Sequence, residues 1–345
     1  SSAASDVYKR QQLDIPHPGW PKVFIRLMKL RVIVLLQITA ICAILVHDLL
    51  ARHGLIDVTR TWEDTFYASL ITVIGGTLSA GGSNAINMWF DADIDQHMRR
   101  TQNRPVPMGH ISATGALLFG SLIAVLGSSL FLLVSWKAAF WSFFSVLFYV
   151  VIYTIWLKRR TPQNIVIGGI AGSTPPLIGW AVAAADYTGG VNPLDLGSAI
   201  PWMLFALIFL WTPPHFWALA LYRSGEYAEA KVPMMNEVKG AEHTIFQSKV
   251  YCILLFMLGS VPCFWPESGL PLIWAFIAGG LTLWYAASVW AIDPNEPFDS
   301  NGRMPKAAKS FFRSLYYLGW MFLLLVLVSV IPPESLGYFG PLSQN

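Results

Sequence analysis

Nine apolar stretches recur along the chain, each close to the about 20 residues that an α-helix needs to cross the hydrocarbon of a bilayer. Polar segments separate them. The stretches are 32–50, 66–89, 113–134, 138–157, 165–185, 199–221, 248–264, 270–291 and 315–331. This pattern predicts an all-α polytopic membrane protein with nine transmembrane helices. We expect one bundle over 32–331, an N-terminal segment at 1–31 and a short tail at 332–345.

The composition rules out a soluble or a disordered protein. Of the 345 residues, 54% are hydrophobic and 12% are charged, whereas a soluble domain carries about 25% charged residues. Disordered chains are poor in aromatic residues, but 14% of this chain is aromatic. The three cysteines form no C-x-x-C pair, so neither a disulfide framework nor a zinc site is indicated.

Lysine and arginine residues are concentrated in alternate polar segments. If the N-terminus is cytoplasmic, all 23 of them except Arg52, Arg60 and Lys137 fall on the cytoplasmic side, as the positive-inside rule requires. We therefore expect a cytoplasmic N-terminus and an external C-terminus. The long cytoplasmic segments 90–112, 222–247 and 292–314 are rich in polar side chains, so we expect the chemistry at the inner face of the membrane.

An acidic motif stands where the second apolar stretch ends. Asn87, Asp91 and Asp95 are spaced four residues apart, which places them on one face of a helix. Carboxylate and amide oxygens are the ligands that Mg²⁺ prefers. The two acids repel each other and oppose the helix dipole, and no Lys or Arg precedes them by one turn. The motif therefore predicts a Mg²⁺ site at these three residues, the alternative being a solvated polar helix end.

Basic residues follow the acidic motif at once. Arg99, Arg100 and Arg104 lie within ten residues of it. Metal-binding acids beside guanidinium groups suit a diphosphate, because this group takes both a bridging metal and charge-assisted hydrogen bonds. We expect all three arginines to bind diphosphate. For Arg99 and Arg100 the alternative is a topological signal or contact with lipid headgroups. No G-x-x-x-x-G-K-[ST] loop indicates a soluble nucleotide site.

Three blocks of sequence resemble the UbiA-type intramembrane prenyltransferases, and specifically their branch that farnesylates haem B. They are NMWFDADIDQHMRRTQNRPVPMGHIS (87–112), TPQNIVIGGIAGSTPPLIGW (161–180) and WTPPHFWALALYRSGEYAEAKVPMM (211–235). The motif of Asn87, Asp91 and Asp95 alone marks the superfamily, and the three blocks together mark the branch. The resemblance covers about residues 25–330. It implies a UbiA-type bundle, Mg²⁺ as cofactor, farnesyl diphosphate and haem B as substrates, and haem O as product.

The segment after the sixth stretch departs from many UbiA-type enzymes, which carry a second Asp-rich motif there. The resemblance to the haem-farnesylating branch places Tyr227 and Lys231 at the equivalent position, and it favours a diphosphate contact for Lys158. Replacing a carboxylate by a lysine removes a metal ligand and supplies a cation. We therefore expect Lys231 and Arg223 to contact diphosphate, with Tyr227 beside them. The number of metal ions stays open, and so does the alternative of an interfacial Tyr/Lys belt.

A histidine lies within the sixth stretch, directly after Pro213 and Pro214. An intramembrane histidine is a functional candidate, and a proline pair that removes backbone hydrogen bonds is expected to open a polar gap beside a protein-lined cavity. We expect His215 to bind haem, either as axial ligand or as a propionate partner. The alternative is a histidine hydrogen-bonded between helices. His97, beside the acidic motif, is expected near the propionates.

The resemblance implies a reaction in which diphosphate leaves, a haem vinyl group attacks farnesyl C1, and water captures the resulting cation. No general base is evident, and diphosphate and Glu226 both remain open. A prenyltransferase for an aromatic or quinone precursor is a second hypothesis, but it would be expected to carry the second Asp-rich motif. A transporter is a third, but its ionisable residues should lie near mid-membrane rather than at the inner face.

The cellular setting follows from the same features. The lipid bilayer is the expected surroundings, and no nucleic-acid partner is indicated. The product implied by the resemblance suggests handover to haem A synthase and terminal-oxidase assembly proteins. No Arg-rich, acid-free presequence is visible, so we expect a bacterial inner membrane rather than a mitochondrial inner membrane.

Overall fold

A computed structural model describes residues 17–96, 101–185, 190–223, 232–265, 269–299 and 303–332. Within these ranges the chain forms helices and turns and no β-strand. The α-helices are α2 (Trp20–Met28), α3 (Leu30–Arg52), α4 (Trp62–Phe90), α5 (Ala92–Asp95), α6 (Ala113–Leu130), α7 (Trp136–Leu147), α8 (Asn164–Ser173), α9 (Pro175–Ala183), α10 (Ile200–Tyr222), α12 (Met235–Lys239), α13 (Ala241–Gly259), α14 (Val261–Phe264), α15 (Leu272–Trp290) and α16 (Pro305–Val330). A 3₁₀ turn, η1 (Phe131–Leu133), follows α6, and a π-helix, η2 (Phe148–Leu157), continues α7.

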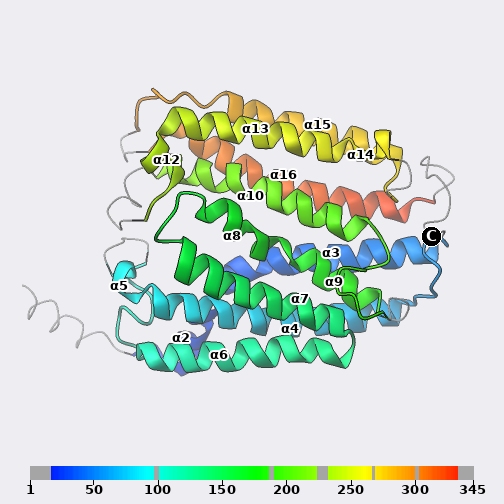
Figure 1. The fold of residues 1–345 in the computed structure, drawn as a ribbon, viewed down its shortest axis with the longest axis horizontal. Helices are drawn as coiled ribbons and strands as arrows, with labels where there is room; N and C mark the ends of the chain where they lie inside the picture. The colour runs from blue at the N-terminus through cyan, green and yellow to red at the C-terminus, as the bar shows by residue number, and fades with distance from the viewer. Residues whose placement is uncertain are drawn as a thin grey trace, which may run out of the picture.

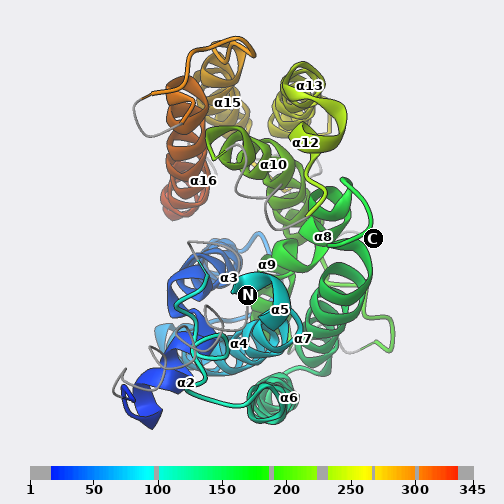
Figure 2. The same cartoon turned by 90° about the vertical axis from the view of Figure 1, so that its left-hand side faces the viewer.

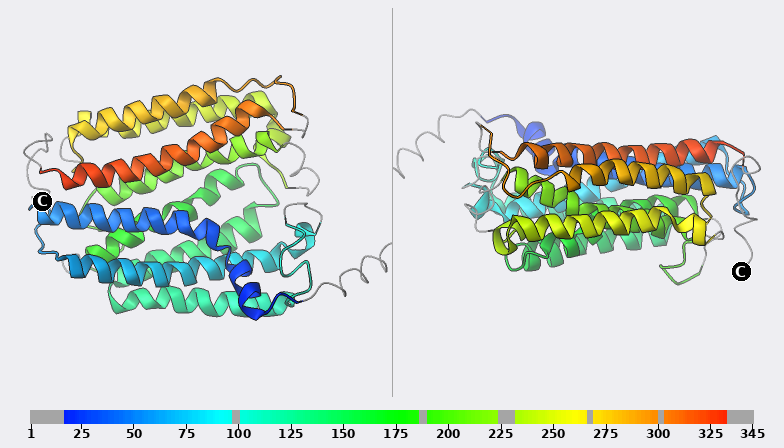
Figure 3. Two further views of the ribbon diagram at one scale, coloured as in Figure 1. Left: turned by 180° about the vertical axis from the view of Figure 1, so that it is seen from behind. Right: turned by 90° about the horizontal axis from the view of Figure 1, so that it is seen from above.

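The long helices run side by side along one common direction (Figure 1), and the views from behind and from above show the same arrangement (Figure 3). In the described part of the chain, seven helical segments are long and apolar enough to cross a membrane. They are Leu30–Arg52, Ala113–Leu133, Trp136–Leu157, Asn164–Ala183, Ile200–Tyr222, Leu272–Trp290 and Pro305–Val330. The prediction of an all-helical, multi-pass membrane protein is confirmed.

Two further long helices lie among these seven but are less apolar. The helix α4 has 29 residues and α13 has 19. In α4 a capping box fixes the start, because Thr61 accepts a hydrogen bond from the Asp64 backbone and Asp64 accepts one from the Thr61 backbone. Its second half carries Ser83, Asn84 and Asn87, all buried within the protein. Inward polar side chains therefore lower the hydropathy of a helix that still runs along the bundle.

Some element boundaries differ from those predicted by hydropathy. The last helix begins at Pro305 rather than at 315, and α13 begins at Ala241 rather than at 248. The early turns of both helices are polar, so a hydropathy pattern misses them, but their backbones are already helical. The N-terminal segment also contains α2, which is separated from α3 by Lys29 in the left-handed conformation, with φ of 54°.

The fifth predicted span is divided into α8 and α9 at Thr174. The proline pair of the sixth span does not end its helix. Pro213 and Pro214 are buried inside α10, yet α10 is continuous from Ile200 to Tyr222. The Thr212 hydroxyl donates to the Ile208 carbonyl over 2.7 Å. The prolines therefore do not interrupt the helix, and they precede His215 without breaking it.

Some helices surround the centre of the bundle and others lie outside them. Seen along the helices, α3, α4, α7, α8, α9, α10 and α16 lie around a common centre, while α6 lies outside α4, and α13 and α15 lie outside α10 and α16 (Figure 2). The helices α4 and α6 approach closely at glycines: a Cβ added at Gly82 would lie 2.4 Å from the Gly120 carbonyl oxygen. Small residues at a helix interface permit such an approach between transmembrane helices.

Candidate functional site

A cavity of about 730 Å³ lies between the helices that surround the centre. Its polar part is formed by side chains at the end of the bundle where α4 meets α5; the wall there includes Lys29, Asn87, Asp95, Arg104 and Lys158. The remainder of the wall is mostly apolar and aromatic; it includes Phe131, Tyr149, Tyr153, Ile178, Trp211, His215, Phe311 and Leu318. One continuous cavity thus joins the acidic motif to the intramembrane histidine.

The acidic motif keeps its helical spacing although the helix changes at Asp91. The Asp91 amide donates to the Asn87 carbonyl over 2.9 Å, and the Asp95 amide donates to the Asp91 carbonyl over 2.8 Å. All three side chains are buried. The Asn87 amide nitrogen donates to Asp91 Oδ2 over 2.8 Å, so these two side chains are in direct contact. Asn87 and Asp95 line the cavity, whereas Asp91 does not.

Two cations outside the motif neutralise it: Arg104, which follows it closely in the sequence, and Lys158, which lies 67 residues from Asp91. Lys158 forms an ion pair with Asp91 Oδ2. Arg104 donates to both carboxylate oxygens of Asp95, over 2.8 and 2.6 Å. The expectation that the acids need an added cation because no Lys or Arg lies one turn away is therefore corrected. The compensating charge comes from loop 101–112 and from the end of η2.

A third basic residue, Lys29, reaches the motif from the junction of α2 and α3. Its Nζ donates to Asn87 Oδ1 over 2.9 Å. Burial lowers the pKa of Lys29 to about 7, and the nearby charges of Arg104 and Lys158 act in the same direction. Sequence reasoning takes Lys29 as a topological signal alone. Its left-handed backbone, uncommon for a residue other than glycine, is a structural sign of a constrained position.

Asp93 lies apart from the motif, as the spacing predicts. Arg159 donates to its two carboxylate oxygens over 2.8 and 2.7 Å, and the Asp93 side chain is 60% exposed. Hydrogen bonds from Arg159 hold the pKa of Asp93 below its usual range. The Arg159 guanidinium also lies 4.6 Å from the centre of the Phe90 ring. The ion pair between Asp93 and Arg159 therefore connects the solvent-exposed side of the α4–α5 junction to the end of η2.

The donor atoms of the motif fit a hard cation such as Mg²⁺. Asp91 Oδ1 is buried and accepts no hydrogen bond from the residues described, although Arg159 Nη2 lies 3.7 Å away. A carboxylate oxygen in this state is a candidate metal ligand. Within the described ranges, no group of three or more His, Cys, Asp or Glu side chains forms a metal site by itself. The candidate set is therefore two carboxylates and the amide of Asn87.

The π-helix η2 turns several polar side chains toward the motif. The Thr154 hydroxyl accepts a hydrogen bond from the Asn87 amide over 3.3 Å, and the Lys158 amide bonds to the Tyr153 carbonyl, five residues back. The rings of Tyr149 and Tyr153 stack with centres 5.4 Å apart, and both line the cavity. π-Helical turns occur frequently at functional sites, because the wider turn changes which side chains share a face.

His215 lies in the wall of the same cavity and is 7% exposed. Its Nδ1 is 2.6 Å from the Ser314 hydroxyl of α16. The imidazole is stacked between Trp211 and Phe311, with ring centres 4.3 and 4.8 Å away. His215 is thus hydrogen-bonded between α10 and α16, as one alternative predicts, and it also lies in the cavity wall, where it could contact a ligand.

Several predicted site residues lie outside the described ranges: His97, Arg99, Arg100, Tyr227 and Lys231. Arg223 is described and follows the last turn of α10, where its guanidinium lies 5.7 Å from the Tyr222 ring. It does not line the cavity. The diphosphate role predicted for Arg223 stays a prediction.

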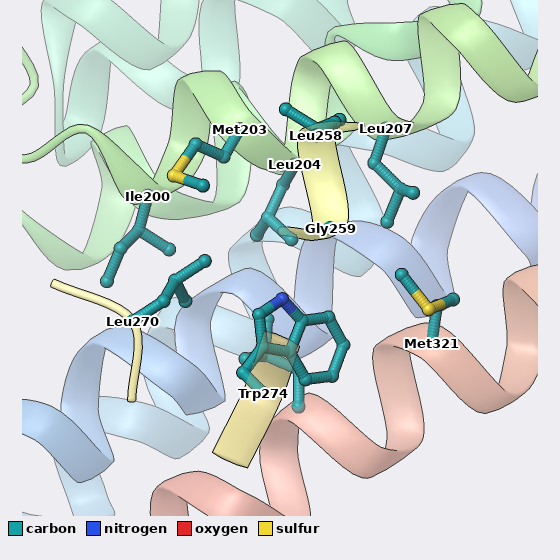
Figure 4. Close-up of a pocket in the computed structure, with 10 residues that line it drawn as sticks. Ile200, Met203, Leu204, Leu207, Leu258, Gly259, Leu270, Trp274 and Met321 are labelled. Atoms are coloured by element: carbon teal, nitrogen blue, oxygen red, sulfur yellow. The ribbon is translucent and has the colours of Figure 1, made fainter. Parts of the chain in front are cut away.

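A second hollow, of about 20 Å³, lies between α10, α13, α15 and α16 (Figure 4). Its wall is formed by apolar side chains and one glycine, including Leu204, Trp274 and Met321. A space of this size without titratable side chains in its wall is a packing void rather than a reaction site.

Comparison with known proteins agrees with this arrangement. The chain matches the UbiA prenyltransferase family over residues 39–316. A protein of Bartonella bacilliformis named protoheme IX farnesyltransferase is 41% identical over 312 residues, which cover 89% of this chain and 91% of that protein. A protein of Parvibaculum lavamentivorans with the same name is 42% identical over 316 residues, covering 91% of this chain and 90% of the relative.

Solved structures share the fold at low sequence identity. A structure described as digeranylgeranylglyceryl phosphate synthase has a TM-score of 0.65 at 17% identity, covering 90% of this chain and 98% of its own. A UbiA homologue of Archaeoglobus fulgidus bound to GPP and Mg²⁺ has a TM-score of 0.55 at 12% identity, covering 89% and 99%. Since the family match spans most of the sequence and relatives exceed 40% identity over about nine-tenths of it, this chain belongs to the UbiA prenyltransferase family and is a prenyltransferase.

Proposed function

We propose that this protein transfers the farnesyl group of farnesyl diphosphate to a vinyl group of haem B, with addition of water, to give haem O and diphosphate. The relatives that are 41 and 42% identical across the chain are named protoheme IX farnesyltransferase. The observation that carries the proposal is the single cavity whose wall contains both the acidic motif with its cations and His215. Two substrates of different chemistry can meet in such a cavity.

The polar part of the cavity is suited to a diphosphate. Lys29, Arg104 and Lys158 lie in its wall and would donate charge-assisted hydrogen bonds to diphosphate oxygens. Asn87, Asp91 and Asp95 would hold Mg²⁺, which when bound supplies neutralising charge for the leaving diphosphate. A homologue bound to GPP and Mg²⁺ has the same fold, which supports this assignment. Arg99, Arg100, Arg223, Tyr227 and Lys231 are proposed to complete the diphosphate site.

The rest of the cavity has to stabilise the allylic cation and exclude bulk water. When the C1–O bond of farnesyl diphosphate breaks, positive charge develops on the allylic carbons. The stacked rings of Tyr149 and Tyr153 line the cavity and would stabilise that charge through their π-systems. Apolar wall residues such as Phe131 and Ile178 would keep bulk water away while the haem vinyl group attacks C1. Water then adds to the carbon next to the porphyrin, and a proton is released.

We infer nine membrane spans with the N-terminus in the cytoplasm. The two long helices that are less apolar, α4 and α13, run along the seven apolar segments (Figure 1). The acidic motif, loop 101–112 and α12 then lie at the cytoplasmic end, beside the lysines and arginines that set the orientation. The bacterial sources of the relatives favour a bacterial inner membrane. Haem A synthase and terminal-oxidase assembly proteins are the proposed recipients of the product.

The test is pigment analysis of the purified protein incubated with farnesyl diphosphate, haem B and Mg²⁺. We expect a product with the mass and retention of haem O, and no product when EDTA removes Mg²⁺. Parallel reactions receive an aromatic acid or a quinone precursor in place of haem B. Prenylation of that precursor without haem O formation would overturn the proposal in favour of the second prenyltransferase hypothesis.

A further inference from the structure

The surroundings of His215 identify which of its nitrogen atoms carries the proton. The Ser314 hydroxyl donates its one hydrogen to the Phe311 carbonyl, over 2.6 Å. Toward His215 Nδ1, also 2.6 Å away, the same oxygen can therefore only accept a hydrogen bond. The hydrogen must then lie on Nδ1. In the neutral imidazole this leaves Nε2 unprotonated, and its lone pair can bind a metal ion or accept a hydrogen bond.

The Nε2 edge is the part of the ring that remains for a ligand. Trp211 and Phe311 cover the two faces of the imidazole, and Ser314 occupies Nδ1. Across the described chain, Nε2 has no hydrogen-bond partner, although the side chain is 93% buried and belongs to the cavity wall. Phe216 lies nearly perpendicular to the ring, at 5.2 Å, and lines the same cavity. A buried imidazole lone pair among aromatic walls is suited to a flat ligand that carries a metal.

A second contact shows that Ser314 orients more than one ring. The Trp211 indole nitrogen donates to the Ser314 carbonyl over 2.9 Å. Trp211 and His215 are four residues apart on α10, and one residue of α16 therefore holds both through separate acceptor atoms. Histidine ligands to metals typically donate their other ring N–H to such an acceptor, which fixes the tautomer and the ring orientation.

We infer that His215 Nε2 is the axial ligand of the iron in the haem substrate, and that Ser314 is a positioning residue that holds the imidazole in the required tautomer. The identity of the ligand as an iron porphyrin rests on the proposed function. The assignment of the donor atom rests on the hydrogen bonds and on the cavity. Axial ligation would hold the iron beside α10, in the same cavity as the acidic motif, so that the porphyrin edge with its vinyl groups could reach the farnesyl carbon.

The experiment measures porphyrin binding to the full-length protein in lipid nanodiscs. Haem B and metal-free protoporphyrin IX are titrated into the wild type, His215→Gly, Ser314→Ala and Ser314→Thr. We expect His215→Gly to lose the imidazole-ligated Soret and resonance Raman signature and to bind haem B at least about 10-fold more weakly, since loss of the partner of a metal ligand already costs that much. Binding of protoporphyrin IX should be unchanged, and added imidazole should restore the ligated spectrum. Ser314→Ala should shift the iron–imidazole vibration, whereas Ser314→Thr, which keeps the hydroxyl, should restore it.

Ser310→Ala is the matched control, because Ser310 is also buried on α16, one turn earlier, but its hydroxyl contacts Ser288 rather than a histidine. It should leave the haem spectrum unchanged. The assignment of His215 as axial ligand would be overturned by an unchanged haem spectrum in His215→Gly. It would also be overturned if the variant lost equal affinity for haem B and protoporphyrin IX. A Ser314→Ala spectrum identical to wild type would overturn the role of Ser314. Haem O formation is assayed separately, so failure of the proposed function and failure of the ligand assignment give different results.

Discussion

Asp91 and Asp93 are two residues apart, yet one is a buried candidate metal ligand and the other belongs to an exposed ion pair. Asp91 is fully buried between Asn87 and Lys158, while the Asp93 side chain is 60% exposed and paired with Arg159. We expect Asp91→Asn to lower turnover at least about 100-fold, since it removes charge at the place where a metal and diphosphate bind. An exposed ion pair contributes about 0–1 kcal/mol to stability, so Asp93→Asn should leave turnover nearly unchanged.

The comparison is made by assaying haem O formation at saturating substrate in matched nanodisc preparations. Thermal unfolding of both variants is recorded to separate lost chemistry from lost folding. Wild-type turnover in a folded Asp91→Asn protein would remove Asp91 from the metal site. A large loss in Asp93→Asn would show that the exposed pair, rather than the buried motif, controls the reaction.

Lys29 offers a second test at the scale of one residue. Its ammonium group lies in the cavity wall and contacts Asn87. Lys29→Met keeps much of the apolar stem but removes the charge, so we expect the KM for farnesyl diphosphate to rise about tenfold, equivalent to about 1.4 kcal/mol. Lys22→Met is the control, because Lys22 is exposed on α2. Equal KM values in wild type and Lys29→Met would show that Lys29 holds Asn87 without contacting the substrate.

The difference between the residues that sequence reasoning identifies and those it misses has a physical origin. Asn87, Asp91 and Asp95 repeat at helical spacing, so their shared face can be predicted from the sequence. Lys29 lies 58 residues from its partner Asn87, and Thr154 lies 67 residues from it. No local pattern encodes such pairs, because they arise only when α3, α4 and η2 pack together.

At the scale of the helix, hydropathy predicts where the chain faces lipid better than where a helix begins. The stretch predicted at 113–134 closely matches the helix over 113–133, whose large exposed side chains, such as Leu118 and Leu122, are apolar. The last helix begins ten residues earlier than predicted because its first turns carry Lys306, Lys309 and Arg313. Likewise, α2 ends at Lys29 because this residue has a left-handed backbone, and η2 is defined by π-type hydrogen bonds. Neither feature can be recognised from hydropathy.

Close approach of α4 and α6 leads to a prediction at the same scale. A Cβ at Gly82 would lie 2.4 Å from the Gly120 carbonyl oxygen and 2.5 Å from the Ala124 backbone nitrogen. Backbone cannot yield as a flexible side chain can, so Gly82→Ala should separate the helices and destabilise the fold by about 1–3 kcal/mol. The loss is measured as a lower unfolding temperature in detergent.

Gly280 is the matched control for this substitution. It lies within α15, and a Cβ added there would meet nothing within 4 Å. Gly280→Ala should therefore be neutral, or should stabilise the helix by up to about 1 kcal/mol. Equal unfolding temperatures for Gly82→Ala and Gly280→Ala would contradict the close packing of α4 on α6.

At the scale of the whole molecule, the polar site and the positive charge lie at the same end of the bundle. The site is formed where α4, α5 and the end of η2 meet, and α14 lies at the opposite end (Figure 1). The orientation proposed above, which follows the positive-inside rule, puts the first end in the cytoplasm. Farnesyl diphosphate, whose charged group cannot enter hydrocarbon unaided, would then approach from the cytoplasmic face, while its apolar chain enters the cavity.

This orientation predicts how native and introduced cysteines react. Cys263 in α14 is exposed at the end opposite the site, whereas Cys252 is buried. A membrane-impermeant maleimide added to intact spheroplasts should therefore label the wild type but not Cys263→Ser. Gln102 is exposed in the loop after α5, so Gln102→Cys in the Cys263→Ser background should be labelled only after the membrane is permeabilised. The reverse pattern would place the diphosphate site outside the cell, where a cytoplasmic isoprenoid diphosphate cannot reach it, and would overturn the proposed orientation.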